Sequence, residues 1–336
     1  MTSPQLSIII LAAGKGTRMK SEKAKVLHEV FYAPMVHYVL NAVIPLKPEQ
    51  TVAIVGHQQS AVKQVLKKFE VDFAVQDQQL GTGHAVLIAE NIVKEDTDTV
   101  MILCGDTPLI RSDTLVRMYR AHKERKATLT LMTTFLADPT NYGRILSIGG
   151  KVRGIVEQKD ADPEQLLINE INAGIYCVDK EFLFSALKMV GTDNSQNEVY
   201  LTDIVRLAVE SNFPVEKVTT IDPLEVLGVN SRLELAEAHR ELQLRRNREL
   251  MMQGVSMYGP ETISISPEST IGKDTLLEAC VRISDGSTIG ESCTVGQGTI
   301  LINCRIGNNV QIGPYSYLSD ITVDSLSTLA AYSRNC

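Results

Sequence analysis

The sequence predicts an α/β domain with a mainly parallel sheet, followed by a short parallel β-helix. Between residues 7 and 222, strand-like apolar runs alternate with segments whose apolar residues recur at helical spacing. Beyond Gly254 the composition shifts towards Ile, Ser, Thr and Gly, and aliphatic residues recur every six positions. Between the two regions, residues 231–253 contain neither Pro nor Gly and resemble one long helix.

The α/β region contains short apolar runs typical of strands, separated by segments with helical spacing. The expected strands are Ser7–Leu11, Thr51–Val55, Asp72–Val75, Thr99–Leu103, Ala127–Phe135 and Gly174–Val178. The expected helices are Ser60–Phe69, His84–Val93 and Asp113–Arg125, with Ser112 or Asp113 as the N-cap of the last.

The C-terminal region contains an internal repeat. Neither a helical nor a strand period explains it, whereas in a β-helix each aliphatic residue points inward from one face of a coil. The repeated residues are Ile265, Ile271, Leu277, Ile283, Ile289, Val295 and Leu301, then, after one slip, Ile306, Ile312 and Leu318. We therefore expect an α/β domain at 1–230, an exposed linker helix at 231–253 and a β-helix at 254–336.

The end of this β-helix needs a cover, because open strand edges attract other chains. No capping helix is visible in the sequence before Cys336. Either the last residues fold over the end, or the chain is a truncated form, or another subunit covers it, as in a homotrimer formed through the β-helix.

A glycine-rich loop follows the first expected strand. Gly14 and Gly16 leave backbone N–H groups free to face an anion, and Arg18 and Lys25 add positive charge nearby. The loop is neither a dinucleotide fingerprint, which needs a third glycine where Met19 stands, nor a P-loop. It therefore predicts a polyphosphate site.

Two further polar segments lie at expected strand ends, where ligands bind in α/β sheets. Asp106 is placed to reach a magnesium–phosphate complex, since Mg²⁺ shares few protein oxygens with substrate phosphates. Gln76 offers the donor and acceptor that the edge of uracil or thymine requires. Gly81 permits a close backbone approach, and Thr82 adds a hydroxyl group.

Composition limits the class of protein. The net charge of −7 argues against a nucleic-acid-binding surface. The six cysteines are scattered, as expected of reduced thiols in the cytoplasm, and no apolar run is long enough to span a membrane. We expect a cytoplasmic protein with neither nucleic acid nor membrane as a partner.

Residues 5–318 resemble the bacterial N-acetylglucosamine-1-phosphate uridylyltransferases. The resemblance rests on several motifs in one order: the opening Leu11-Ala-Ala-Gly-Lys-Gly-Thr-Arg18 with Lys25, Gln76…Leu-Gly-Thr-Gly-His84, Gly105-Asp106-x-Pro-Leu109, Asp138-Pro-Thr-x-Tyr-Gly-Arg144, Gly154-Ile-Val-Glu157, Asn169-Glu-Ile-Asn172 and Gly228-Val-Asn230. It implies a Rossmann-like nucleotidyltransferase domain followed by a left-handed parallel β-helix of hexapeptide repeats.

The resemblance also implies substrates and residue roles. The substrates would be UTP and N-acetylglucosamine 1-phosphate, and the products UDP-N-acetylglucosamine and pyrophosphate. Arg18 and Lys25 would be catalytic, and Mg²⁺ would be held by Asp106 and Asn230. Nucleotide binding would fall to Leu11, Ala13, Gly14, Gln76 and Gly81, and sugar binding to Thr82, Gly143, Glu157 and Asn172.

The chain departs from the family pattern at several positions. Ala24 and Cys104 stand where Pro and Tyr are usual, and Asn141 and Gln158 where Gly and His are expected. In the family the β-helix continues to an acetyl-transfer site, which lies beyond Cys336, so no acetyltransferase activity is expected. A nucleotidylyltransferase for another sugar or for thymidine triphosphate is the alternative enzyme, and a non-catalytic assembly subunit is the alternative of another class.

Overall fold

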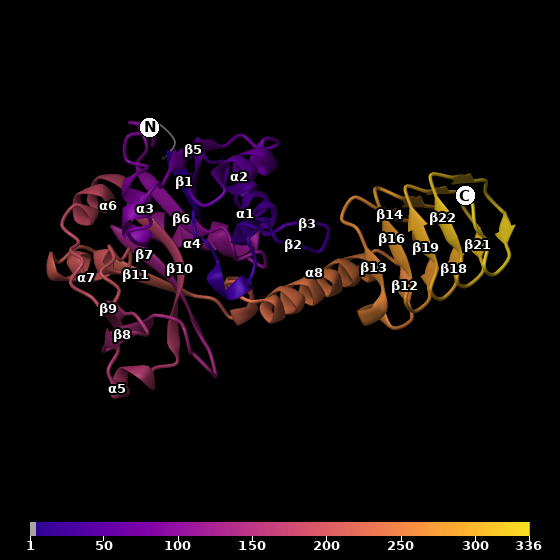
Figure 1. Ribbon diagram of the computed structural model, residues 1–336. Helices are drawn as coiled ribbons and strands as arrows, with labels where there is room; N and C mark the ends of the chain where they lie inside the picture. The colour runs from indigo at the N-terminus through magenta and orange to yellow at the C-terminus, as the bar shows by residue number, and fades with distance from the viewer. Residues whose placement is uncertain (1–4, 336) are drawn as a thin grey trace. The chain divides into compact units, whose positions relative to one another are not determined.

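The structure is a computed structural model that describes residues 5–335. It divides into two compact units (Figure 1). The first unit runs to Glu29 and continues over Ala33–Glu234, and the second combines Val30–Tyr32 with the chain from Leu235 onward. The second unit includes residues 30–32 because Phe31 N donates to His239 Nδ1 at 3.1 Å and the Tyr32 and Ser264 hydroxyls lie 2.7 Å apart.

The first unit is built around one twisted sheet whose strand order is β11-β7-β10-β6-β1-β4-β5. Its strands β6, β1, β4 and β5 are mutually parallel, as are β7 and β11, while β10 runs antiparallel to both β6 and β7. The bounds are β1 Leu6–Ala12, β4 Gln50–Val55, β5 Asp72–Val75, β6 Thr99–Cys104, β7 Leu129–Phe135, β10 Glu170–Asp179 and β11 Val215–Thr219. The mainly parallel α/β sheet is thus confirmed.

Continuous burial explains the strands at the centre of this sheet. Ile8, Ile9 and Ile10 of β1 are all fully buried and belong to two core clusters, one on each face. A strand covered on both faces reads as an unbroken apolar run. A β8–β9 hairpin (Arg144–Ile148 and Lys151–Val156), which no sequence pattern indicated, joins the sheet beside β10.

The helices of the first unit depart from expectation at their ends. The structure has α2 at Gln59–Leu66, α3 at Thr82–Leu87 and α4 at Ser112–Glu124. Beyond Leu87 the chain continues as hydrogen-bonded turns, although Ala89 and Val93 remain buried. The expected cap of α4 is wrong, because Arg111 occupies the N-cap position and no side chain caps the helix. The remaining helices are α1 Met35–Val43, α5 Pro163–Leu166, α6 Lys180–Leu187 and α7 Asp203–Glu210.

The second unit is a parallel β-helix whose short strands form three sheets. The successive coils pair Ile265 with Ile283, Leu301 and Leu318, and all of these side chains are buried in one core. The slip after Leu301 arises at a corner one residue shorter than the corner after Ile283. The three sheets have the orders β12-β15-β18-β21-β24, β13-β16-β19-β22 and β14-β17-β20-β23, with strands from Ser256–Met257 (β12) to Thr328–Leu329 (β24). The six-residue pattern thus predicted the inward positions, and the β-helix is confirmed.

The last described residues continue the coils. Tyr317 bridges to Arg334 in parallel, and Tyr317 N donates to Ser333 O at 2.9 Å. Within residues 5–335 the structure therefore does not show the first of the three alternatives, in which the last residues fold over the end.

The long helix α8, Arg232–Met252, begins and ends within one residue of the expected segment. Most of its side chains are exposed or half-buried, but Ala238, Leu242, Asn247 and Leu250 are buried. Asn247 Nδ2 donates to Pro260 O at 2.7 Å and to Ile263 O at 2.8 Å, and Leu250 joins the core of the β-helix. Across residues 5–335, no helix combines the length and apolar character needed to cross a bilayer.

Candidate active site

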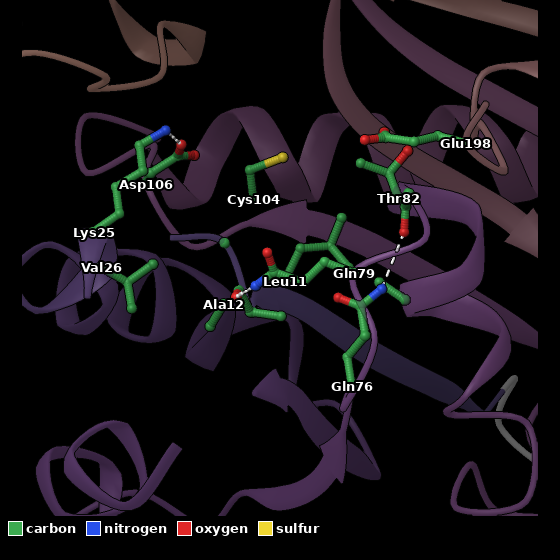
Figure 2. A pocket seen from close by; sticks show the side chains of 14 residues that line it. Leu11, Ala12, Lys25, Val26, Gln76, Gln79, Thr82, Cys104, Asp106 and Glu198 are labelled. Atoms are coloured by element: carbon green, nitrogen blue, oxygen red, sulfur yellow. Dashed lines mark hydrogen bonds and ion pairs between the residues drawn. The ribbon is translucent and has the colours of Figure 1, made fainter. Parts of the chain in front are cut away.

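A cavity of about 280 Å³ opens where β1, β5 and β6 end at their carboxyl edges. Figure 2 shows Lys25 and Asp106 at one end of this cavity, Gln76 and Thr82 at the other, and Cys104 between them. The adjacency follows from the sheet, since Leu11 of β1 pairs with Cys104 of β6. The predicted site residues that line the cavity are Leu11, Ala13, Gly14, Lys25, Gln76, Gly81, Thr82 and Asp106.

The nucleotide end is shaped by amide side chains from the segment after β5. Gln76 is buried, and its Nε2 donates to Gly81 O at 3.1 Å. Gln79 Nε2 donates to Ala13 O at 2.7 Å, which ties this segment to the glycine-rich loop. All five residues predicted to bind the nucleotide therefore meet at one cavity wall.

Gly81 has little room for a side chain. Its φ is +111°, and an added Cβ would lie 2.5 Å from Val199 O. We expect Gly81→Ala to lower the free energy of unfolding by roughly 1–3 kcal/mol, because it adds both backbone strain and overlap. Thermal denaturation measures this loss. Gly149→Ala is the matched control, since Gly149 also has a positive φ but has no neighbour within 4 Å. Equal losses in both variants would contradict the overlap.

The opposite end concentrates cationic and oxygen groups. Lys25 Nζ forms an ion pair with Asp106 and also donates to Asn230 Oδ1. Arg18 Nη2 donates to the same Asn230 oxygen at 2.8 Å. Val229 N donates to Asp106 O at 2.9 Å, which holds the two oxygen-bearing segments together. Arg18 and Asn230 do not line the cavity, but they join it through these contacts.

The donor set of Asp106 and Asn230 fits a hard divalent cation. Their side-chain oxygens already converge on one positive group, the Lys25 ammonium. Within residues 5–335 no cluster of three or more His, Cys, Asp or Glu residues could hold a metal. One carboxylate and one amide oxygen leave most of the coordination shell to phosphates and water, as Mg²⁺ prefers.

Gly143, Glu157 and Asn172 form a separate cluster, and none of them lines the cavity. Gly143 directly precedes β8, Glu157 directly follows β9, and Asn172 lies on β10. Asn172 N donates to Gly143 O at 2.9 Å, and Asn172 Nδ2 donates to the Tyr176 hydroxyl at 2.6 Å. Burial raises the pKa of Tyr176, and the charges of Glu157 and Cys104 add to the rise. Gly174 connects this cluster with Cys104 on the cavity wall, because Gly174 N donates to Asn172 Oδ1 at 3.1 Å and Cys104 Sγ donates to Gly174 O at 3.9 Å. Of the four predicted sugar residues, only Thr82 lines the cavity itself.

Burial also raises the pKa of Glu157 above its ordinary 4.5, although a hydrogen bond from Thr202 opposes the shift. A raised pKa means that the folded state binds this proton more tightly, so stability declines as pH rises from about 4.5 through the folded value. We expect Glu157→Gln to remove this decline, which amounts to about 1.4 kcal/mol for each pH unit between the unfolded and folded pKa values. The measurement is the difference in unfolding free energy between variant and wild type from pH 4 to 8. A difference that does not grow with pH would contradict the assignment.

Sequence reasoning missed several residues of this wall. Gln79 and Cys104 lie inside motifs that were noticed, so a closer reading of those motifs finds them. Burial raises the pKa of Cys104 to about 12, which keeps it a thiol. Glu198 lines the cavity and Thr202 contacts Glu157, and both belong to a segment far from the other site residues in sequence. This segment is held beside the cavity because Leu201 N donates to Thr82 Oγ1 at 3.1 Å. No local sequence pattern indicates either residue.

Comparison with known proteins identifies the family. The family model described as nucleotidyl transferase matches residues 7–222. A protein named "Bifunctional protein GlmU" from Desulfotalea psychrophila is 51% identical over 98% of this chain and 97% of its own length. The protein of the same name from Syntrophotalea carbinolica is 42% identical over 95% of this chain and 68% of its own length.

One solved structure supports the fold alone. A crystal structure from Bacillus anthracis, assigned as a glucose-1-phosphate thymidylyltransferase, has a TM-score of 0.56 and 18% identity. It covers 70% of this chain, and 94% of its own length is matched. The relatives confirm the resemblance expected from the motifs. The chain belongs to the nucleotidyl transferase family, among the relatives named GlmU.

Proposed function

We propose that this enzyme is an N-acetylglucosamine-1-phosphate uridylyltransferase that forms UDP-N-acetylglucosamine and pyrophosphate from UTP. One observation carries the proposal: Arg18, Lys25, Asp106 and Asn230 converge at one end of a cavity whose other end presents Gln76. A polyphosphate requires positively charged hydrogen-bond donors, and a pyrimidine base requires a group that both donates and accepts hydrogen bonds. The cavity offers the first at one end and the second at the other.

The base end would read the pyrimidine through hydrogen bonds. The side-chain amide nitrogen of Gln76 donates a hydrogen bond to Gly81 O, and this bond fixes the orientation of the side chain. Leu11 and Ala13 supply apolar contact beside it, and the backbone at Gly14 faces the phosphates. Uracil and thymine offer the same hydrogen-bonding edge, so this wall supports a pyrimidine without choosing between them.

The sugar phosphate would approach from the side of Thr82. Gly143, Glu157 and Asn172 would hold its sugar, with Glu157 accepting from a hydroxyl group and Gly143 leaving room for it. A phosphate monoester has a second pKa of about 6, so it is already a dianion near neutral pH and needs no general base.

The reaction would be an in-line displacement. A phosphate oxygen of the sugar phosphate forms a bond to the α-phosphorus of UTP, and the bond from that phosphorus to the bridging oxygen breaks, which releases pyrophosphate. Arg18 and Lys25 neutralise the two approaching polyanions and fix their geometry. Family members of this class use a divalent cation, and we propose Mg²⁺ held by Asp106 and Asn230. Held by these two residues, the cation would supply positive charge against the charge that develops on the reacting phosphates.

The discriminating experiment measures pyrophosphate release from UTP or dTTP, each with Mg²⁺ and a panel of sugar 1-phosphates. We expect the largest kcat/KM with UTP and N-acetylglucosamine 1-phosphate, and no release with EDTA. A larger value with another sugar or with dTTP would replace the proposed substrate. No release with any sugar would favour a non-catalytic assembly subunit. Acetyl-CoA consumption with glucosamine 1-phosphate, assayed in parallel, tests the expectation that the chain does not transfer acetyl groups.

We further propose a cytoplasmic enzyme that assembles as a homotrimer through its β-helix. Free thiols at Cys104, Cys177, Cys280, Cys293 and Cys304 support a reducing compartment, and Cys336 lies outside the described residues. Sedimentation velocity of the purified chain tests the trimer. The absence of nucleic-acid partners stays a prediction from net charge, and the absence of membrane partners stays a prediction from the length of the apolar runs.

A further inference from the structure

The loop that carries Gly143 is held by a guanidinium buried without an acidic partner in direct contact. The Arg144 side chain is only 2% exposed. Its Nη1 donates to Tyr142 O, and its Nη2 donates to Gln158 Oε1 at 2.8 Å. Both acceptors are neutral, and the buried Nε has no hydrogen-bond partner among residues 5–335. Because burying a charge is costly, each remaining hydrogen bond matters for keeping this side chain in place.

A single oxygen atom of the Gln158 side chain contacts two residues of this loop. Gln158 Oε1 accepts from Arg144 and also from Asn141 N, at 3.2 Å. Asn141 has a φ of +73°, a conformation that Asn tolerates better than most residues. Asn141 and Gln158 are therefore in direct contact.

The loop fixed by this oxygen borders the proposed sugar residues. Gly143 O accepts from Asn172 N at 2.9 Å. A Cβ at Gly143 would lie 3.0 Å from Ile155 Cγ2 and 3.4 Å from Glu157 Oε2, so the backbone there is already closely surrounded. A displacement of the loop by a few tenths of an ångström would change its distances to both Glu157 and Asn172.

We infer that Gln158, acting through Asn141 and Arg144, is a positioning residue for the sugar phosphate. It holds the 141–143 backbone at the spacing from Glu157 and Asn172 that the sugar requires. This inference rests on the proposed function, because it takes Gly143, Glu157 and Asn172 as the sugar side of the site.

The inference predicts an effect confined to one substrate. The nucleotide wall is built from Gln76, Gly81 and Ala13, and the cationic end from Lys25 and Asp106. No hydrogen bond of Gln158 reaches these groups within residues 5–335. Loosening the loop should therefore raise KM for the sugar phosphate and leave KM for UTP unchanged.

The experiment compares two substitutions of similar size at Gln158, which is half-buried. Gln158→Met removes the oxygen acceptor, whereas Gln158→Glu keeps an oxygen for Asn141 N and pairs with the guanidinium. For Gln158→Met we expect KM for N-acetylglucosamine 1-phosphate to rise about tenfold, the loss typical of hydrogen bonds to a charged donor. KM for UTP and kcat should stay within about twofold of wild type, and Gln158→Glu should restore the sugar KM.

Arg144→Lys is a second test, since Lys keeps the charge but cannot donate to both acceptors in the same fork geometry. We expect the same selective rise in sugar KM. Arg153→Gln is the matched control, because Arg153 is an exposed cation on the neighbouring strand β9, and its KM values should not change.

The outcomes separate the inference from the proposed function. An unchanged sugar KM in Gln158→Met, or an equal rise for both substrates, would overturn the positioning role while wild-type turnover still supports the function. Failure of Gln158→Glu to restore the sugar KM would also overturn it. If the wild type releases no pyrophosphate with any sugar phosphate, the proposed function fails and this inference fails with it.

Discussion

Asp106→Ala is expected to lower kcat for pyrophosphate release by about a thousandfold or more, because it removes the carboxylate that lines the cationic end of the cavity. The lost group would bind the divalent cation and now pairs with Lys25. Asp106 is half-buried at the end of β6, so the variant should stay folded. Steady-state kinetics measures the turnover, and circular dichroism checks the fold.

Asp77→Ala is the control for this loss. Asp77 is an exposed carboxylate that lines a neighbouring cavity rather than the proposed active site, and its removal should leave turnover unchanged. Binding of Mn²⁺, followed by electron paramagnetic resonance in the presence of UTP, gives a second readout. Near-native turnover or unchanged Mn²⁺ affinity in Asp106→Ala would remove Asp106 from the metal site.

Arg18→Ala is expected to lower kcat by a factor of about a hundred to a thousand, the typical loss when a group that stabilises developing charge is deleted. The Arg18 side chain is exposed, and its Nη2 donates a hydrogen bond to Asn230 Oδ1. Its removal leaves no cavity in the core, so the melting temperature should not fall. Single-turnover kinetics with saturating UTP separates the chemical step from binding.

Lys15→Ala controls for charge on the same loop. Lys15 is exposed and lines the neighbouring cavity, so its loss should change KM for UTP only modestly. If Lys15→Ala and Arg18→Ala lowered turnover equally, the effect would come from the net charge of the loop. The specific role of Arg18 would then be wrong.

Local patterns in the sequence identified the parts of the site because those parts lie where strands end. The aliphatic run Leu6–Ala12 forces a central strand, and Gly14 and Gly16 can then only follow at its carboxyl edge. The same argument placed Asp106 after β6 and Gln76 after β5. In parallel strands these edges coincide, so the residues of one cavity could be predicted without coordinates.

The β-helix was equally predictable, for a related reason. Each face of a coil places one side chain in the core, so an aliphatic residue at every sixth position indicates the repeating coils of the β-helix. Ile283, Leu301 and Leu318 pair in register on successive coils, as this pattern predicts. The sequence could not reveal that α8 packs on this core, because the apolar residues of the helix do not follow one regular stripe.

The two folds and the family follow from short-range patterns and from the order of the motifs, so they could be predicted from the amino-acid sequence alone. Which side chains meet depends on tertiary packing. Lys25 contacts Asn230 across 205 positions of the chain, and Gln158 contacts Asn141 across 17. Such contacts depend on how whole elements pack, because the antiparallel strand β10 and the β8–β9 hairpin bring distant segments to one wall. The glycine-rich loop predicted an anion site from local sequence, whereas the residues that meet it are brought there by packing.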